Sequence, residues 1–329
     1  MKKNYLLLLL SLFLLSCSDD QNDTKVIHQA FTDLVYFDNQ FFLTYRESDK
    51  HLHGRDGVIK VYNSEDAENW NLMAEFSSAG FDLRDPKFSV REDELELYMH
   101  GSKYDGEIIT EFRDYRSKFS HSVGWENLEN VVLDNLKIST SKIAGNEAWP
   151  WRVTWYNKTA YTFGYSLDNK LDLYTSIDGL FFKGSNTSVS KNDFFGNEAT
   201  IRVNEKGDFY AIIRSQNLLL AKSTDNNKSW QVFDKIRVFA FGGPNFVFYK
   251  NKMLITGRDS DLMQVILYSY DLDSQTYKKS YVFPSAGDCG YAGMVIKDVD
   301  LWISYYSSHE KKKGSSVYVV KLKLEDLSL

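Results

Sequence analysis

The chain has 329 residues and a formal net charge of −6, with 43% hydrophobic and 15% aromatic residues but only four prolines. This charge argues against nucleic acid as a partner, because binding to phosphates needs clustered lysine and arginine. The aromatic-rich composition is typical of β-strands, whose pleated surfaces favour aromatic and β-branched side chains. The length is enough for one large β domain or two small ones.

The N-terminal residues are typical of a targeting segment. Two lysines precede an apolar run over residues 6–15, which is too short to span a bilayer as a stable helix. The run ends in a Leu-Leu-Ser-Cys sequence at Cys17, which matches the bacterial lipobox, in which the cysteine is lipidated after cleavage. We predict a lipoprotein signal peptide over residues 1–16 and an acidic tether over residues 17–24.

The acidic residues that follow Cys17 resemble the surface-export signals of Bacteroidetes lipoproteins. We therefore expect the protein to be lipid-anchored in the outer membrane and surface-exposed, with the lipid anchor as its membrane contact. The other cysteine is Cys289, so lipidation of Cys17 leaves no pair for an intramolecular disulfide. The stability of the fold must then come from its core.

Six hairpins of similar pattern follow along the chain. Each has a polar or charged opening residue, two alternating strands joined by a short turn, and a polar or charged end. They cover residues 33–46, 85–100, 152–166, 198–214, 245–258 and 291–306. Their starts lie roughly 45 to 65 residues apart, which is the size of a four-stranded propeller blade. The sequence predicts an all-β fold, a six-bladed β-propeller of four-stranded antiparallel blades.

A second element recurs after the hairpins. Residues 64–70, 176–182 and 223–230 follow the form Ser-x-Asp-x-Gly-x-x-Trp of an Asp-box, and residues 120–125 are a degraded copy. In this turn the Ser and Asp side chains cap backbone groups and the Trp packs between blades, so its role is structural. We expect one domain over residues 25–329. Residues 25–27 are expected to pair with residues 317–324 to close the ring.

The ends of the six hairpins are expected to meet at one central pocket. In a propeller the innermost strand of each blade starts at the pocket rim, and the second strand returns to the same face. Charged residues recur at these ends, which a core does not need. The residues expected to bind substrate are Asp33, Arg46, Arg84, Asp85, Arg152, Arg214, Arg258 and Asp288. The spacing of His, Cys and Asp does not resemble a metal site, so we predict neither metal nor cofactor.

Two segments resemble those of sialidases, a superfamily of glycoside hydrolases. The stretch Asn197-Glu198-Ala199-Thr200, with Arg214 downstream, is similar to the segment in which a glutamate opens blade four and an arginine closes its second strand. The stretch Gly287-Asp288-Cys289-Gly290-Tyr291 resembles the segment that opens the last blade with a catalytic tyrosine. The resemblance implies an exo-acting hydrolase that removes a terminal, acidic sugar from glycans.

The resemblance also implies the role of each catalytic residue. Tyr291 would be the nucleophile and Glu198 the base that takes its proton, since a phenol needs a base to become reactive. Asp56, on the loop of blade one where sialidases carry an acid/base aspartate, would protonate the leaving oxygen and later activate water. Arg214 and Arg258 would hold an acidic group of the substrate. We expect a glycan as partner and a monomeric protein.

One departure from the sialidase pattern lies in blade one. Sialidases open this blade with one arginine of a cluster of three that binds the substrate carboxylate, whereas here the segment reads Phe31-Thr32-Asp33-Leu34. An aspartate cannot bind a carboxylate as a bidentate partner. Either Arg46, Arg84 or Arg152 completes the cluster from elsewhere, or the substrate is a different sugar.

Three other functions stay open at this point. The stretch Leu83-Arg84-Asp85-Pro86-Lys87 resembles the Arg-Asp-Pro motif of five-bladed fructan and arabinan hydrolases, in which Asp33, Asp85 and Glu198 would be the catalytic carboxylates. A polysaccharide lyase would use Tyr291 or a histidine as base against a uronate. A surface lipoprotein that binds glycans without cleaving them is the non-enzymatic alternative.

Overall fold

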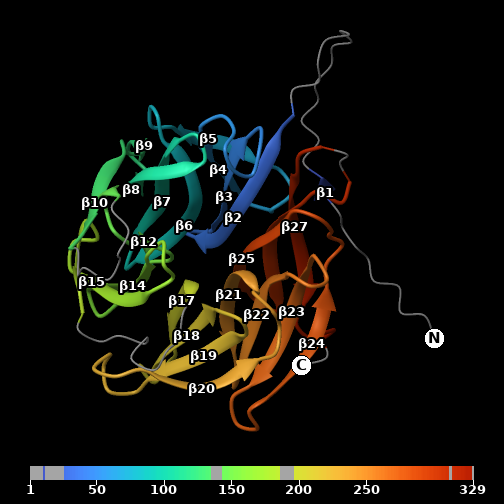
Figure 1. The fold of residues 1–329 in the computed structure, drawn as a ribbon. Helices are drawn as coiled ribbons and strands as arrows, with labels where there is room; N and C mark the ends of the chain where they lie inside the picture. Colours follow the sequence, from blue (N-terminus) through green and yellow to red (C-terminus); the bar gives the residue numbers. More distant parts are fainter. Residues whose placement is uncertain (1–9, 12–25, 135–142, 186–195, 311–312, 328–329) are drawn as a thin grey trace.

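The computed structural model describes residues 10–11, 26–134, 143–185, 196–310 and 313–327. These residues form β-sheets arranged around a central axis (Figure 1). Four sheets have four strands each, and a fifth has eleven strands because it joins two blades edge to edge. The fold is therefore the predicted all-β, six-bladed propeller.

Blade one shows the plan of the molecule. Its strands follow one another outward from the axis as β2 (His28–Phe37), β3 (Gln40–Ser48), β4 (Val58–Ser64) and β5 (Asn71–Phe76). The turn between β2 and β3 places Asp38 and Asn39 at φ 46° and 62°. Such two-residue hairpin turns require the left-handed region, which Asn and Asp tolerate better than most residues.

Blades two and three share the eleven-stranded sheet. Blade two contains β6 (Asp82–Arg91), β7 (Glu94–Asp105) and β8 (Ile108–Ser120), with β9 (Gly124–Trp125), β10 (Glu129–Leu133) and β11 (Ala144–Gly145) paired to β8. Blade three contains β12 (Trp149–Pro150), β13 (Thr154–Tyr156), β14 (Thr159–Tyr165), β15 (Leu171–Ser176) and β16 (Phe181–Gly184). A parallel pair between β10 and β16, with Val132 opposite Phe181, joins the two blades.

The last three blades are regular. Blade four contains β17 (Asn197–Val203), β18 (Phe209–Arg214), β19 (Leu218–Ser223) and β20 (Gln231–Ile236). Blade five contains β21 (Gly242–Tyr249), β22 (Lys252–Asp259), β23 (Gln264–Asp271) and β24 (Thr276–Val282). Blade six contains β25 (Cys289–Lys297), β26 (Asp300–Ser307) and β27 (Ser316–Lys323), and β1 (Leu10–Ser11) pairs with the outer edge of β27.

The ring closes near the predicted place. The chain meets the last blade just before β27: the backbone N–H of Ser315 donates to the carbonyl oxygen of Ile27 (3.3 Å), and His28 forms a parallel bridge with Ser315. This contact lies two residues before the predicted stretch 317–324, and residue 25 lies outside the described residues. The outer edge of β27 pairs with Leu10 and Ser11, opposite Val319 and Tyr318. Cleavage before Cys17, which stays a prediction, would remove β1.

The innermost strands carry a repeated irregularity. The register to the neighbouring strand shifts by one residue in β2, β6, β17, β21 and β25. At each of these β-bulges one residue has a positive φ; these residues are Phe31 (60°), Asp85 (49°), Glu198 (43°), Gly243 (59°) and Tyr291 (51°). A left-handed residue other than glycine costs roughly 1 kcal/mol or more, and bulges re-aim side chains next to active sites.

A ring of hydrogen bonds fastens each innermost strand to the next blade. The six bonds are Phe88 N to Asp33 Oδ2, Ser89 Oγ to Val153 O, Thr154 Oγ1 to Ile201 O, Thr200 Oγ1 to Pro244 O, Asn245 Nδ2 to Ala292 O and Thr32 Oγ1 to Tyr291 O, with lengths from 2.7 to 3.0 Å. The last bond joins blade one to blade six. These polar side chains can be buried near the axis because each has a hydrogen-bond partner in the next blade.

The Asp-box segments form the turns expected of them. In blade one, the Ser64 hydroxyl accepts from the N–H of Ala67 (2.9 Å), and Asp66 Oδ1 accepts from the N–H groups of Glu68 and Asn69 (both 2.8 Å). The Ser and Asp of the copies in blades three and four cap their turns in the same way. In blade four, the Trp230 ring lies 5.1 Å from that of Phe163 in blade three.

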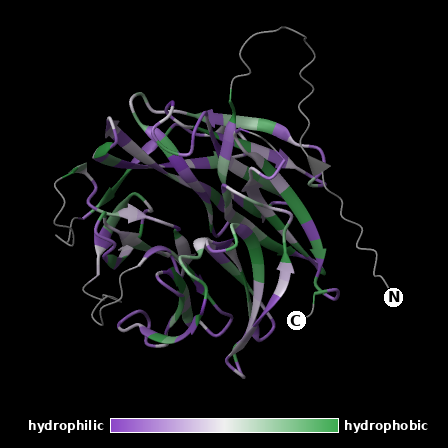
Figure 2. Ribbon diagram, turned by 45° about the vertical axis from the view of Figure 1, so that its right-hand side comes forward, coloured by the Kyte–Doolittle hydropathy of each residue, from purple (hydrophilic) through white to green (hydrophobic). Residues whose placement is uncertain are grey.

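Aromatic packing between blades explains the composition. Phe41 of blade one lies 4.9 Å from Trp302 of blade six, and Phe42 lies 6.4 Å from Trp125, which follows β8. Successive residues of β3 therefore pack on opposite sides of blade one, because successive side chains of a strand point to opposite faces of the sheet. The strands carry both hydrophobic and hydrophilic residues (Figure 2). None of the described residues belongs to a helix long and apolar enough to cross a membrane.

Candidate active site

Tyr291 and Glu198 meet close to the axis. They come from the bulges of blades six and four, and the Tyr291 hydroxyl donates to Glu198 Oε1 at 2.7 Å. The same carboxylate accepts from Arg214 Nη1 (2.7 Å) and, through Oε2, from the N–H of Gly243 (2.7 Å). A base within hydrogen-bond reach of a phenol is the arrangement that the nucleophilic use of tyrosine requires.

The environment assigns the proton to the tyrosine. Burial acts to raise the pKa of Glu198, but the Arg214 guanidinium, the Tyr291 hydroxyl and the Gly243 N–H outweigh burial, and the pKa lies below its usual value. Burial and the neighbouring Glu198 charge raise the pKa of Tyr291 well above the usual value for a phenol. At neutral pH the pair therefore consists of a carboxylate and a neutral phenol.

Gly243 is needed where it stands. It has a φ of 59°, and a Cβ at this position would lie 2.6 Å from Cγ of Tyr291. We expect Gly243→Ala to displace the Tyr291 ring from Glu198 and to lower kcat by about 10²-fold, since misplacement of a reacting group by about 1 Å costs that much. Steady-state kinetics on a cleavable glycoside measures this. Unchanged kcat in a folded Gly243→Ala variant would contradict the packing argument.

Three of the residues predicted to bind substrate, Asp33, Arg46 and Arg152, are enclosed by protein. Arg152 donates through both Nη atoms to Asp33 (2.8 and 3.0 Å), and Arg46 donates through Nε to Asp82 (2.7 Å). The side chains of Arg46 and Arg152 are 0% and 3% exposed. Their guanidinium groups are thus occupied by internal carboxylates, and Asp33 also belongs to the ring of bonds between blades. These three side chains support the pocket from within.

Arg84 and Asp85 lie closer to the pocket. The Arg84 guanidinium lies 4.8 Å from the centre of the Phe31 ring and donates through Nε to Asp85 Oδ2 (3.3 Å). Phe31 lies at the bulge of blade one, in the segment where sialidases have an arginine. The Arg84 guanidinium therefore packs on the residue found there instead of that arginine. Oδ1 of Asp85 is buried with no hydrogen-bond partner among the described residues. A buried carboxylate oxygen without a hydrogen-bond donor is costly, and a hydroxyl group of a bound sugar could supply that donor.

Arg214 and Arg258 keep part of their side chains open to solvent. Their exposed fractions are 21% and 15%. Arg214 is bound to Glu198, whereas Arg258 lies 3.9 Å from Asp288 Oδ1 and 3.5 Å from the carbonyl oxygen of Cys289, both weak contacts. These two side chains are therefore the arginines best able to reach a ligand.

Asp288 is the centre of a polar cluster at the seam between blades one and six. Its Oδ2 lies 2.6 Å from His28 Nε2 and 2.8 Å from His51 Nδ1, and its Oδ1 accepts from the Tyr306 hydroxyl at 2.8 Å. One potential metal-ligand atom from each of His28, His51 and Asp288 lies within 4.8 Å of the other two, so these residues are close enough to bind one metal ion.

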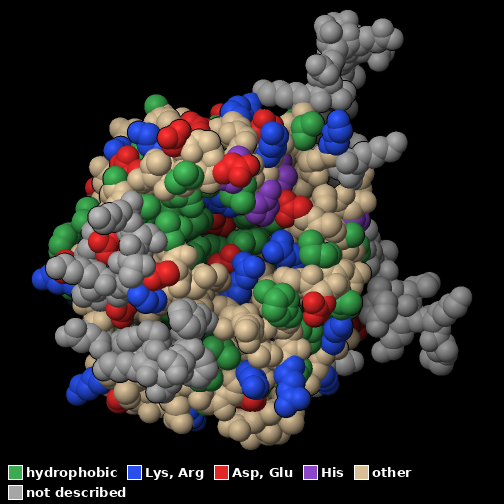
Figure 3. All heavy atoms as spheres, in the orientation of Figure 1, with side chains coloured by type: hydrophobic (Ala, Val, Ile, Leu, Met, Phe, Trp, Pro, Cys, Tyr) green, Lys and Arg blue, Asp and Glu red, His purple; other side chains and the backbone are tan. Residues whose placement is uncertain are grey.

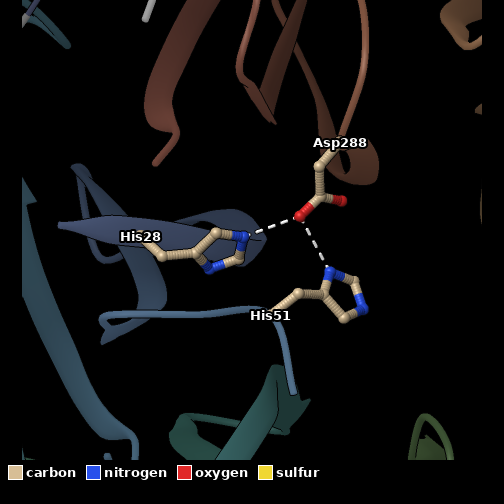
Figure 4. Close-up of side chains that lie close together, drawn as sticks. All are labelled: His28, His51 and Asp288. Atoms are coloured by element: carbon tan, nitrogen blue, oxygen red, sulfur yellow. Dashed lines mark hydrogen bonds and ion pairs between the residues drawn. The ribbon is translucent and has the colours of Figure 1, made fainter. Parts of the chain in front are cut away.

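The geometry of this cluster is that of hydrogen bonds. Both ring nitrogens point at the same carboxylate oxygen (Figure 4), which stands where the two nitrogens converge. An ionised carboxylate only accepts, so both nitrogens carry hydrogen in this arrangement. His28 Nδ1 is buried without a partner, whereas a metal-bound His28 would need an acceptor for it. We assign a hydrogen-bonded cluster.

Asp56 lies on the same loop as His51 but apart from these contacts. It is exposed and has no hydrogen-bond partner among the described residues.

On the face of the molecule drawn in Figure 3, a hollow at the centre of the ring is bordered by hydrophobic, acidic, basic and histidine side chains.

Sequence reasoning overlooked Lys87. Its ammonium lies 5.3 Å from the Trp151 ring and 6.0 Å from the Tyr291 ring, and it donates to the carbonyl oxygen of Thr32 at 3.3 Å. Burial lowers its pKa to about 8 against the opposing effect of nearby carboxylates, Asp33 first. Its position two residues after Asp85 in an innermost strand was the available signal.

The fold is a β-propeller similar in structure to solved sialidases. No family model and no curated protein matches the sequence. Among solved structures, the chain is similar to a mutant of Trypanosoma rangeli sialidase displaying trans-sialidase activity, with 15% identity and a TM-score of 0.70, over 91% of this chain and 55% of that one. The chain therefore spans little more than half of that protein.

Two further structures have the same fold. One is the NanB sialidase from Streptococcus pneumoniae, with 9% identity and a TM-score of 0.67, over 94% of this chain and 70% of that one. The other is the endosialidase of phage phi92, with 11% identity and a TM-score of 0.64, over 92% of this chain and 68% of that one. The TM-scores establish that the fold is shared. Identities this low do not establish a shared activity, which has to be argued from the residues of the site.

Proposed function

We propose that the protein is a glycoside hydrolase of the sialidase type, which removes a terminal, acidic sugar from glycans. The observation that carries the proposal is the 2.7 Å hydrogen bond between Tyr291 and Glu198, two buried residues from bulges on different blades. A strained backbone at both positions is costly for the fold and is expected where geometry serves chemistry.

The pair performs the first step as follows. Glu198 takes the proton of the Tyr291 hydroxyl while the phenol oxygen attacks the anomeric carbon. The glycosidic bond breaks, its electron pair stays with the leaving oxygen, and a general acid protonates that oxygen. A neutral phenol suits a substrate whose carboxylate lies beside the anomeric carbon, because an anionic nucleophile would be repelled. Arg214 holds the ionised Glu198 in position beside the phenol through its bond to Oε1. Water hydrolyses the glycosyl-tyrosine in the second step, with retention of configuration.

The acidic character of the sugar is inferred from the open arginines. Arg214 and Arg258 are the partly exposed cations described above, and Phe31 stands where a third arginine is expected. Two guanidinium groups bind one carboxylate in the proposal, and Asp85 Oδ1 accepts from a hydroxyl of the sugar. Because position 31 is a phenylalanine and not an arginine, the substrate can be an acidic sugar other than sialic acid. Uronic acids are therefore tested beside sialic acids.

The fructan-hydrolase alternative is weakened by Asp33. A nucleophile must face the substrate, but Asp33 is 1% exposed and its carboxylate is taken up by Arg152 and the Phe88 N–H. We therefore propose no role for Asp33 in catalysis.

A glycan panel tests the proposed function. Purified protein is incubated with sialosides, uronides and pentosides, and released sugar is measured. We expect release of an acidic sugar, and a fall in rate of about 10²- to 10⁴-fold in Glu198→Gln, because the phenol then has no base. Binding to these glycans without release by wild-type protein would favour the non-catalytic alternative.

We also propose that Cys17 carries a lipid and anchors the protein at the outer membrane. The lipobox match supports this proposal. In the native host, Cys17→Ser is expected to move the protein from the membrane fraction to the soluble fraction, because one lipidated residue supplies the whole attachment. Fractionation with immunoblotting measures the shift. Membrane association of Cys17→Ser that is unchanged would point to another anchor.

A further inference from the structure

The loop between β3 and β4 brings two ionisable side chains toward the pocket side of blade one. Asp56, at its end, is exposed, as described above. His51, near its start, has a side chain that is 34% exposed and held at one end by Asp288. A general acid is most effective when a second residue orients it toward the leaving oxygen. Only His51 of these two has such a partner among the described residues.

His51 is linked to Tyr291 through one shared neighbour, Phe31. Its ring makes an edge contact with Phe31, with 5.1 Å between centroids, and Phe31 makes an edge contact with Tyr291 at 4.9 Å. The two rings therefore contact the same phenylalanine at the bulge of blade one. The second nitrogen of His51, Nε2, points away from Asp288 (Figure 4).

Asp288 is built to stay ionised and fixed. Burial acts to raise its pKa, but hydrogen bonds from His28, His51 and Tyr306 outweigh burial and bring the pKa well below the usual value. Its backbone N–H is bound to the Ser308 hydroxyl (3.0 Å), which fixes the main chain at this point. A fixed carboxylate that accepts from one ring nitrogen orients the imidazole, so that the other nitrogen faces away from it and can transfer a proton.

We propose that His51, oriented by Asp288, is the general acid and base of the reaction, in the place that the sialidase resemblance gives to Asp56. The inference rests on the proposed function. In the first step, Nε2–H of the imidazolium gives its proton to the glycosidic oxygen as its bond to the anomeric carbon breaks and the Tyr291 oxygen bonds to that carbon. In the second step, Nε2 takes a proton from water, whose oxygen displaces the Tyr291 oxygen, and Glu198 returns the phenol proton.

Leaving groups of different basicity distinguish an acid from a structural residue. The probes are the 4-nitrophenyl and methyl glycosides of N-acetylneuraminic acid and of glucuronic acid, whichever sugar the wild type releases. Methoxide is strongly basic and must be protonated as it leaves, whereas 4-nitrophenolate is a stable anion that leaves without a proton. We expect His51→Gln to lower kcat/KM for the methyl glycoside by about 10²- to 10⁴-fold, and for the 4-nitrophenyl glycoside by less than about tenfold.

Two further arms complete the experiment. Azide is expected to raise kcat of His51→Gln on the 4-nitrophenyl glycoside and to form a glycosyl azide, because azide attacks the intermediate without a base. Asp56→Asn is the matched control on the same loop, and both of its kcat/KM values are expected to stay within about twofold of the wild type. A partly misfolded His51→Gln would lose both substrates equally, so the ratio of the two values is an internal control.

Each other outcome overturns a stated part of the inference. Selective loss on the methyl glycoside in Asp56→Asn would return the acid role to Asp56, and an equal loss on both substrates in His51→Gln would make His51 structural. Wild-type activity that is lost on dialysis against a chelator and restored by Zn²⁺ would assign the cluster to a metal. A wild type that releases neither sugar would overturn the proposed function, and this inference with it.

Discussion

Tyr291→Phe is expected to lower kcat by at least about 10³-fold while the protein stays folded. The substitution keeps the ring and its packing against Phe31 and removes only the hydroxyl that donates to Glu198. Glu198 keeps its bonds to Arg214 and Gly243, so its charge remains compensated. The loss in rate then reflects the missing nucleophile, one member of a set of residues that act together.

Kinetics and thermal unfolding together measure this effect. The variant is assayed on the 4-nitrophenyl glycoside, on which a missing general acid has little effect, so the loss is assigned to the nucleophile. The melting temperature of Tyr291→Phe is expected to lie within a few degrees of the wild-type value, because a single neutral hydrogen-bond donor is removed. A Tyr291→Phe variant with full activity would end the proposed mechanism.

Arg152→Ala is expected to destabilise the fold by about 3–5 kcal/mol. The carboxylate of Asp33 is buried, and removing its bidentate partner leaves it with the Phe88 N–H and with the charge of the nearby Lys87, but without a hydrogen-bonded cation. Because Asp33 also fastens blade one to blade two, the loss also weakens the contact between these blades. Urea unfolding followed by fluorescence measures the change as a lower midpoint at unchanged slope.

The double variant Asp33→Asn/Arg152→Met separates charge from packing. It removes both charges and keeps similar volumes, so we expect it to recover most of the stability that Arg152→Ala loses. A fructan-hydrolase mechanism makes a different prediction: Asp33→Asn alone would abolish turnover and leave stability nearly unchanged. An Arg152→Ala variant as stable as the wild type would show that the pair is not the buried support described here.

The architecture was predictable because its determinants are local. Strand alternation and tight turns depend on neighbouring residues, and a repeat of roughly 45 to 65 residues is the length of one blade. The Asp-boxes cap their own turns, as in the bonds of Ser64 and Asp66 to residues 67–69. Glu198 and Tyr291 were found for the same reason, since each lies in a short segment with its own recognisable pattern.

The choice between Phe31 and Asp33 could not be read from the sequence. A β-bulge inserts one residue and shifts the alternation of side chains, so the pattern does not show which residue of blade one faces the pocket. The chain places Phe31 at the bulge and turns Asp33 toward Arg152. The same shift places Gly243, and not Asn245, against Tyr291 in blade five.

The sequence by itself determined the β-propeller and its blades through periodicity, and it pointed to Glu198 and Tyr291, which meet in a hydrogen bond, through the resemblance of two short segments to those of sialidases. The tertiary structure alone decided the partners of the arginines and the cluster at Asp288. His28 and His51 are 260 and 237 residues from Asp288 in the chain, and they meet it because the ring closes blade six against blade one. Contacts made by closure have no local signature, since the residues that form them carry no pattern in common.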